Sequence, residues 1–153
     1  MSIFQSMPGF LIRRLNQIAA SVFLERMAAM GLDLTPVQFA ALAALSDNPG
    51  VDQATLAGLI AYDRVTIGGV VDRLAAKGLV MRDINARDRR ARLVSLTDAG
   101  TALLERVLPE VRALQADILS GLGPGDVDAF VDLARRAAEA GNARSRAPLR
   151  ARD

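Results

Sequence analysis

Apolar residues recur every three or four positions in two long stretches of the chain, residues 9–30 and residues 98–119. The first stretch carries Leu11, Leu15, Ile18, Val22 and Met27, and the second carries Leu103, Leu104, Val107, Leu108, Val111, Leu114, Ile118 and Leu119. Polar and charged side chains stand between them. This spacing predicts two long amphipathic helices, the second starting from a cap at Thr97-Asp98.

Capping residues predict a further helix between these two. The run Thr35-Pro36-Val37-Gln38 has a hydroxyl at the N-cap, proline at the first helical position and glutamine three residues after the cap. A helix is therefore expected over residues 36–45. The turn-forming residues 47–50 end it.

Two shorter helices follow. Asp52 is a good N-cap for the first, which buries Leu56, Leu59 and Ile60. The second spans residues 64–77 and ends at Gly78; its apolar face carries Ile67, Val71 and Leu74. Two short helices joined by the tight turn at 61–63 predict a helix-turn-helix.

Two strand-like runs after this motif predict a β-hairpin. Residues 79–84 and 92–96 are strand-like, and a polar stretch at 85–90 separates them. A hairpin directly after a helix-turn-helix is a wing. The expected fold class is therefore mainly α with a small two-stranded β-wing, a winged helix-turn-helix with N- and C-terminal dimerisation helices.

The C-terminal part has three expected features. Pro109 lies inside the second long helix and predicts a kink or a local break there. A turn at 121–126 leads into a last helix over residues 127–140. Residues 141–153 show no periodicity and are expected to be a disordered tail.

The expected domains are residues 1–34, an N-terminal helix contributing to dimerisation; 35–97, the winged helix-turn-helix; and 98–140, the C-terminal dimerisation helices. Neither long apolar stripe can be covered by one small winged domain alone, which favours pairing across a two-fold axis. Packing within one chain is the alternative.

Composition excludes several kinds of site. The 153 residues include no cysteine and no histidine, so thiolate or imidazole zinc sites, thiol redox sensing and histidine-dependent triads are ruled out. The acidic residues are scattered singly. We expect no metal, no cofactor and no enzymatic activity. The chain has no apolar run of membrane-spanning length and no signal-peptide pattern at its start, so a cytoplasmic location without membrane association is expected.

Charge is distributed unevenly. The formal net charge is only +2, yet residues 82–92 contain five arginines and two aspartates. A basic patch on a nearly neutral chain indicates a polyanionic partner. The alternative is a solvated loop with incidental charge.

Four short runs, in this order and at this spacing, resemble the MarR (multiple antibiotic resistance regulator) family of transcriptional regulators. They are TPVQF at 35–39, DQATLA at 52–57, DRL at 72–74 with KGLV at 77–80, and DRR at 88–90 with LTDAG at 96–100. The resemblance covers about residues 9–140. It implies a homodimer that binds a palindromic operator in double-stranded DNA and is often released by a small phenolic or aromatic acid.

The helix over residues 64–77 is expected to enter the major groove. Its unburied positions are Arg64, Thr66, Gly68, Gly69 and Arg73. Arg64 can pair with guanine, Thr66 can contact a phosphate or a thymine methyl, and Arg73 fits a phosphate. Each glycine costs a helix about 1 kcal/mol relative to alanine, so the pair calls for a reason, and close approach to DNA is one. The alternatives are packing that tolerates the glycines or a flexible turn at this point.

Two further contacts complete the expected DNA interface. Gln53 is placed to reach a phosphate from the start of its helix, or simply to complete that helix start. In the hairpin, Asp88 stands two residues before Arg90 and is expected to orient its guanidinium. Arginine suits the negative potential of a narrow minor groove. In the family this Asp-x-Arg pair has that role; a surface ion pair is the alternative, and Arg87, Arg89 and Arg92 are expected to contact phosphate or solvent.

The family's ligand pocket lies between its first, second and fifth helices, which implies a site here formed by Phe10, Arg14, Gln17 and Phe39. Arg14 and Gln17 lie one turn apart and can together hold a carboxylate, with Phe39 as an aromatic wall. The expected effector is an aromatic carboxylate or its thioester, and the expected action is repression. The alternative for Arg14 is a surface or dimer contact.

The whole chain also has an alternative interpretation. It could be a dimeric ligand- or partner-binding helical protein without DNA binding; a small helical enzyme is a more remote alternative.

Overall fold

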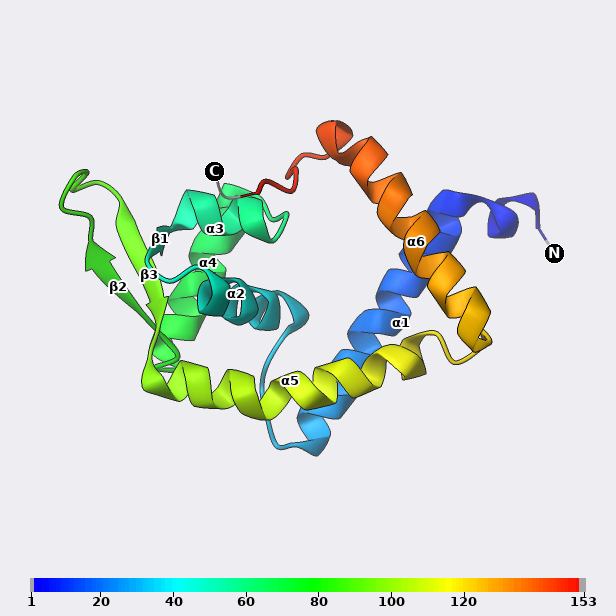
Figure 1. The fold of residues 1–153 in the computed structure, drawn as a ribbon, viewed down its shortest axis with the longest axis horizontal. Coiled ribbons are helices and arrows are strands. Elements are labelled where there is room, and N and C mark those ends of the chain that lie inside the picture. Colours follow the sequence, from blue (N-terminus) through cyan, green and yellow to red (C-terminus); the bar gives the residue numbers. More distant parts are fainter. Residues whose placement is uncertain (1, 152–153) are drawn as a thin grey trace.

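The computed structural model describes residues 2–151, which form two groups of helices joined by one long helix (Figure 1). The elements are η1 (Ile3–Ser6), α1 (Pro8–Ala29), α2 (Pro36–Asp47), β1 (Val51–Asp52), α3 (Gln53–Leu59), α4 (Arg64–Ala76), β2 (Val80–Ile84), β3 (Arg92–Leu96), α5 (Asp98–Ile118), α6 (Pro124–Gly141) and η2 (Asn142–Arg144). One group contains α2, α3, α4 and the sheet. The other contains α1 and α6, and α5 runs through both (Figure 1).

Side-chain caps begin the helices where the sequence predicts them. Thr35 accepts a hydrogen bond from the Gln38 backbone N–H at 3.3 Å, and the Gln38 side chain returns the capping-box bond. Asp52 accepts from Thr55 N–H at 2.7 Å at the start of α3. These bonds satisfy backbone donors that a helix start leaves free, so short local sequence patterns were sufficient to predict them.

The sheet has three strands rather than the two that the sequence predicts. Its order is β1-β3-β2, all antiparallel, with Val51 opposite Val94 and Val80 opposite Leu96. The two hairpin strands are confirmed. The additional strand is only two residues long, too short to show alternation in the sequence, and it exists because β3 offers it a free edge.

The core fills the space between the helix-turn-helix, α2, the sheet and α5. Its most deeply buried side chains include Met27, Leu42, Leu45, Leu56, Ile67, Val71, Leu74, Val94, Val107 and Leu114. Phe23 and Met27 join it from α1. Most of these positions lie on the predicted apolar faces, because burial of those faces drives the packing.

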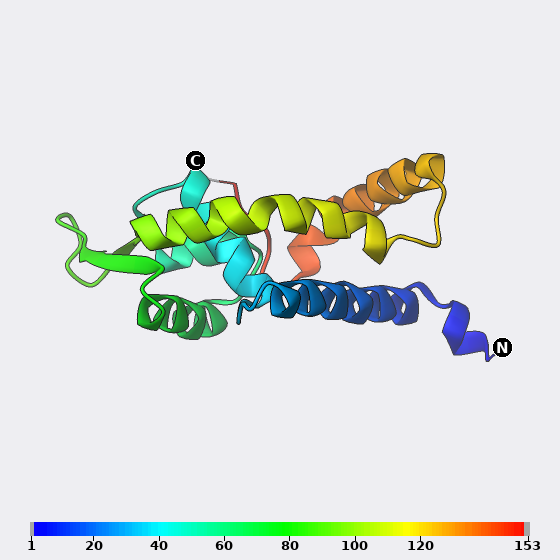
Figure 2. The same ribbon diagram turned by 90° about the horizontal axis from the view of Figure 1, so that it is seen from below.

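Helices α1 and α5 lie side by side, as the view from below shows (Figure 2). Arg26 of α1 bridges two carboxylates of α5: its guanidinium lies 2.7 Å from Glu110 and 2.9 Å from Asp117.

Helix α5 continues through Pro109 without the local break that was one of the two expected outcomes there. Proline removes the bond to the carbonyl of Glu105, and both residues are exposed, so water can satisfy that carbonyl.

The C-terminal segment differs from the predicted disordered tail. Residues 142–151 follow a defined course, with a short η2 turn and a backbone hydrogen bond from Arg150 N–H to the Gly58 carbonyl at 2.9 Å. The sequence has no periodicity there because the segment is held by specific polar contacts and not by an apolar stripe. Within residues 2–151, no single helix is long and apolar enough to cross a bilayer.

Candidate nucleic-acid interface

Helices α3 and α4 meet at 105° around a tight turn, the geometry of a helix-turn-helix. Ala61 in the turn has a positive φ of 53°, and the Tyr62 N–H donates to the Ala57 carbonyl at 2.9 Å. α4 buries Ile67, Val70, Val71 and Leu74 against the core. Its opposite face is consequently free to meet a partner.

That free face carries three consecutive exposed residues at the start of α4: Arg64, Val65 and Thr66. Arg64 and Thr66 were predicted as contacts. Val65 was not, although its side chain is 91% exposed. An apolar residue lying off the buried stripe of a helix was the available signal, and an exposed valine suits contact with a thymine methyl.

Asp63 caps α4 and binds Thr66 twice. Its carboxylate accepts from the Thr66 backbone N–H and from the Thr66 hydroxyl, both at 2.8 Å. The backbone bond is the main cause that lowers the pKa of Asp63 below its ordinary value, followed by the hydroxyl bond, with a smaller contribution from the charge of Arg146. The Thr66 hydroxyl proton is thereby used within the protein, which leaves its methyl group for an outside partner.

The paired glycines Gly68 and Gly69 are not required by packing within the chain. A Cβ on Gly68 would lie 3.8 Å from Gln53 Nε2, and one on Gly69 would lie 3.8 Å from Arg73 Nη1. Both are ordinary van der Waals distances. Since alanine would favour the helix at either position, close approach of an outside partner to the α4 backbone remains the better explanation.

Gln53, Arg82 and Asp72 form a polar network beside the glycines. Gln53 Oε1 accepts from Arg82 Nε at 3.1 Å, and Arg82 Nη2 lies 2.5 Å from Asp72. Gln53 therefore keeps only its amide N–H donors for a phosphate. Arg82 belongs to the basic patch expected over residues 82–92, but its charge instead links α3, α4 and β2.

In the wing, Asp88 was expected to orient the Arg90 guanidinium, but it binds the backbone of the turn instead. Its Oδ1 accepts from the Arg90 backbone N–H at 3.0 Å, and its carbonyl accepts from Ala91 N–H at 3.0 Å. Asp88 thus shapes the turn between β2 and β3. Arg90 is exposed near the tip of the wing, where its guanidinium is available to an outside partner.

The structure does not bring the four predicted ligand residues together within one protomer. Phe10 packs against Phe4, with ring centroids 5.1 Å apart, whereas Phe39 packs against Phe23 at 5.9 Å. Phe10 and Phe23 are thirteen residues apart on α1, about 20 Å along the axis. Arg14 lies about two and a half turns before Phe23, on the opposite side of α1 from it.

Gln17 has a partner within α1 that the sequence did not predict, and within the described part of the chain its amide N–H donors stay free for a carboxylate. Its Oε1 accepts from Arg13 Nη1 at 3.1 Å, and the Arg13 guanidinium lies 5.1 Å from the centre of the Phe10 ring. Arg14 is exposed. Within residues 2–151 Arg14 makes no ion pair, so its charge is not neutralised by the chain.

The sequence was compared with protein families and with individual proteins of known function. The MarR family profile matches residues 32–91, the part that contains α2, α3, α4 and most of the wing. The HTH-type transcriptional repressor NicR of Pseudomonas putida is 35% identical over 128 residues, which is 84% of this chain and 80% of that protein.

Two solved structures have the same fold over nearly the whole chain. The Bordetella bronchiseptica regulator BpsR, solved in a study of the regulation of its DNA binding by 6-hydroxynicotinic acid, has a TM-score of 0.82 and 31% identity, covering 90% of this chain and 97% of that one. PcaV of Streptomyces coelicolor, in complex with its natural ligand, has a TM-score of 0.80 and 32% identity, covering 92% and 98%. The chain belongs to the MarR family of winged helix-turn-helix transcriptional regulators.

Proposed function

We propose that this chain is a cytoplasmic, homodimeric transcriptional repressor that binds an inverted-repeat operator and leaves it when an aromatic acid binds. The observation that carries the proposal is the exposed start of α4. Arg64, Val65 and Thr66 offer a guanidinium, an apolar branch and a methyl group in one turn, and the half-buried Gly68-Gly69 pair behind them has no side chain to hold a partner away from the backbone. Together these suit readout of base edges in the major groove.

Unburied apolar side chains support dimerisation. No residue of α6 is buried, and Val131 and Leu133 are 53% and 59% exposed. Exposed apolar residues also gather on η1, on α1 and at the residue between them: Ile3, Phe4, Met7, Leu11, Ile12 and Ile18. A second copy can cover both surfaces, as a monomer of this size rarely leaves so much apolar surface in water. A two-fold dimer would meet an operator of two inverted half-sites.

The operator itself gives the direct test. Fragments bound by the purified chain are selected from the source genome, and duplexes of about 30 base pairs are then compared by fluorescence anisotropy over a salt series. We expect the selected inverted repeat to bind at least about 1,000-fold more tightly than a random duplex. The affinity should also fall steeply with salt, since arginines displace counterions from phosphates.

Equal and weak binding of the selected and random duplexes would contradict the proposal. It would favour the alternative of a helical ligand- or partner-binding protein without DNA recognition. A duplex with one half-site scrambled serves as the control for dimeric binding, and it should bind more weakly than the intact repeat.

For the effector, we propose that Arg14 binds the carboxylate of an aromatic acid. Two findings support this: the guanidinium has no carboxylate partner within residues 2–151, and the relative BpsR has its DNA binding regulated by 6-hydroxynicotinic acid. Because Phe39 lies on the other side of α1, the aromatic contacts of the ligand in this proposal come from residues other than Phe39.

The matched pair Arg14→Ala and Arg13→Ala tests this site. Benzoates, cinnamates, their thioesters and 6-hydroxynicotinic acid are titrated against the operator complex, and release of the duplex is measured. We expect Arg14→Ala to need about 10- to 100-fold more acid, the range for loss of a charge-assisted hydrogen bond. Arg13→Ala should respond like the wild type because that guanidinium is engaged by Gln17 and Phe10. Equal responses of Arg14→Ala and wild type would rule out the role of Arg14.

A further inference from the structure

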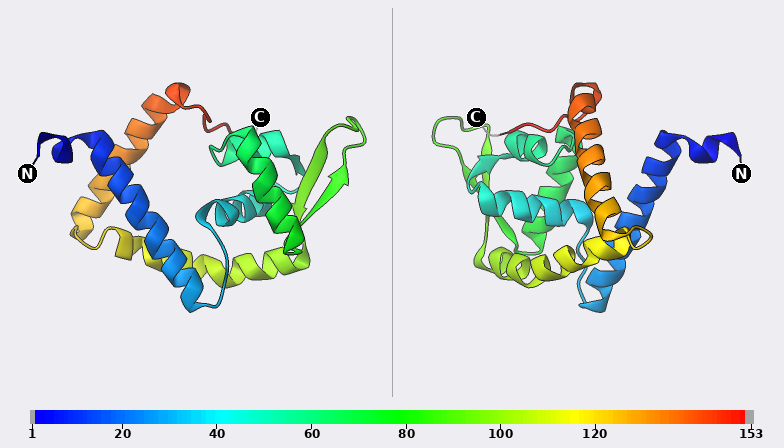
Figure 3. Two further views of the ribbon diagram at one scale, coloured as in Figure 1. Left: turned by 180° about the vertical axis from the view of Figure 1, so that it is seen from behind. Right: turned by 45° about the vertical axis from the view of Figure 1, so that its right-hand side comes forward.

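The C-terminal tail, residues 142–151, packs beside the start of α4. Asn142 closes the tail into a loop: its Nδ2 donates to the Leu149 carbonyl at 2.9 Å, and its Oδ1 accepts from Leu149 N–H at 2.8 Å. The tail, in red, leaves α6 and reaches α3 in both further views (Figure 3). It ends on the same side of the molecule as the tip of the wing (Figures 1 and 3).

Gly58 of α3 is the residue on which the tail rests. Its carbonyl accepts from Arg150 N–H at 2.9 Å. A Cβ at Gly58 would lie 3.2 Å from the Arg150 Cβ, closer than such atoms ordinarily approach, and 3.5 Å from its Cδ, an ordinary contact distance. The absence of a side chain at Gly58 therefore allows the Arg150 stem to lie flat against α3.

The tail gathers positive charge next to Arg64. Arg64 and Arg150 line one open groove of about 480 Å³ together with Asp52 and Thr55, and Arg146 joins them in a second groove of about 180 Å³. The two aspartates nearby, Asp52 and Asp63, already cap helices through Thr55 and Thr66. Within residues 2–151, none of the three arginines has an ion pair with a carboxylate.

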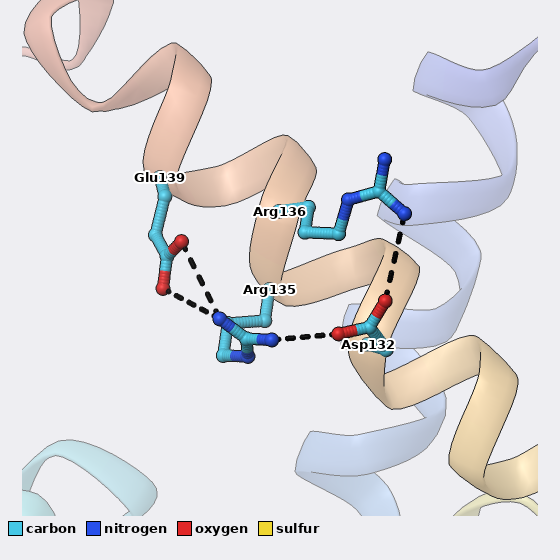
Figure 4. A network of polar contacts seen from close by, with 4 residues as sticks. All are labelled: Asp132, Arg135, Arg136 and Glu139. Carbon is cyan, nitrogen blue, oxygen red and sulfur yellow. Dashed lines mark hydrogen bonds and ion pairs between the residues drawn. The ribbon is translucent and has the colours of Figure 1, made fainter.

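The arginines of α6 behave differently. Arg135 pairs with Asp132 at 2.6 Å and with Glu139 at 3.2 Å, and Arg136 lies 3.5 Å from Asp132 (Figure 4). Their charge is balanced on their own helix. The segment 142–151, by contrast, contains Arg144, Arg146 and Arg150 and no acidic residue. Its excess positive charge is exposed and is available to a partner outside the chain.

We propose that residues 142–151 form a DNA-binding arm, in which Arg146 and Arg150 contact phosphates beside the bases read by α4. The inference rests on the proposed function, since it extends the same DNA interface. The opposite role, a tail that blocks α4 until it is displaced, does not suit the charge. A segment that occupies a phosphate-binding surface in place of DNA would be acidic, and this one is basic.

Three variants test the arm on the selected operator: removal of residues 142–153, the double substitution Arg146→Gln/Arg150→Gln, and Gly58→Gln, which displaces the tail but keeps its charges. The matched control is Arg135→Gln/Arg136→Gln, which removes the same charge from α6. Circular dichroism and gel filtration verify the fold and the oligomeric state of each variant. Affinity is then measured over a salt series with the operator and with a random duplex of equal length.

We expect each arm variant to lose about 10- to 100-fold in affinity on both duplexes near 0.1 M salt. In Arg146→Gln/Arg150→Gln, which loses two arginines from each protomer, the slope of log affinity against log salt should become shallower by up to about 4 in a dimer. The control should keep the wild-type affinity and slope. Loss on both duplexes is expected because phosphate contacts carry no base information.

Unchanged affinity and slope in the truncated chain and in Arg146→Gln/Arg150→Gln would overturn the inference while leaving the proposed function intact. Tighter binding by the truncated chain would also overturn it, in favour of a blocking tail. Failure of the wild type to prefer its selected operator would overturn the proposed function together with the arm.

Discussion

Replacing Gly100 by alanine is expected to destabilise the folded chain by about 3 kcal/mol or more, the upper range for overpacking a buried site. A Cβ at this position would lie 2.0 Å from the Leu79 carbonyl oxygen, and that oxygen also accepts from Thr97 N–H at 3.1 Å. Neither the Leu79 carbonyl nor the start of α5 can move away from the other without breaking this Thr97–Leu79 bond. Urea unfolding at a fixed protein concentration measures the effect.

Gly121→Ala is the matched control. Gly121 has open space around the position of a Cβ, and its φ is not positive, so we expect a change within about 0.5 kcal/mol. If Gly100→Ala and Gly121→Ala had the same free energy of unfolding, the close contact between α5 and Leu79 would be wrong. The contact would explain on steric grounds why the run Leu96-Thr97-Asp98-Ala99-Gly100 ends in glycine.

Arg90→Ala is expected to weaken operator binding about 10- to 100-fold at constant salt, the range for losing one specific arginine contact. The fold should be unaffected, because the exposed guanidinium makes no hydrogen bond or ion pair within residues 2–151 and the wing turn is held by Asp88 through the backbone N–H. Fluorescence anisotropy with the selected operator, and unfolding of the free protein, measure the two effects separately.

Arg87→Ala distinguishes an inserted side chain from general wing charge. Arg87 is also exposed on the wing. If it contacts a phosphate, Arg87→Ala should lower affinity equally on operator and random duplexes. Arg90→Ala should instead reduce the preference for the operator. The same uniform loss in both variants would mean that Arg90 does not read the minor groove.

Local sequence determined much of the secondary structure. Helix starts depend on bonds between a cap and the residue three positions later, as at Thr35 and Asp52, so they are encoded within four consecutive residues. Helix faces are encoded by spacing, and Ile67, Val71 and Leu74 are buried as their periodicity predicts. The exposed face of α4 follows from the buried one, which is why Arg64 and Thr66 could be selected without a structure.

The tertiary structure decided the contacts between residues far apart in the chain. Arg82 pairs with Asp72 and Gln53, so an arginine that the sequence assigned to a basic patch stabilises the protein instead. Phe10 and Phe39, expected in one pocket, contact different parts of α1. The tail contacts a distant helix, where Arg150 N–H donates to the Gly58 carbonyl and the Arg150 stem lies over the bare Gly58 Cα. Periodicity reports which face of an element is buried, but it carries no information about which distant element covers that face; packing in three dimensions sets that.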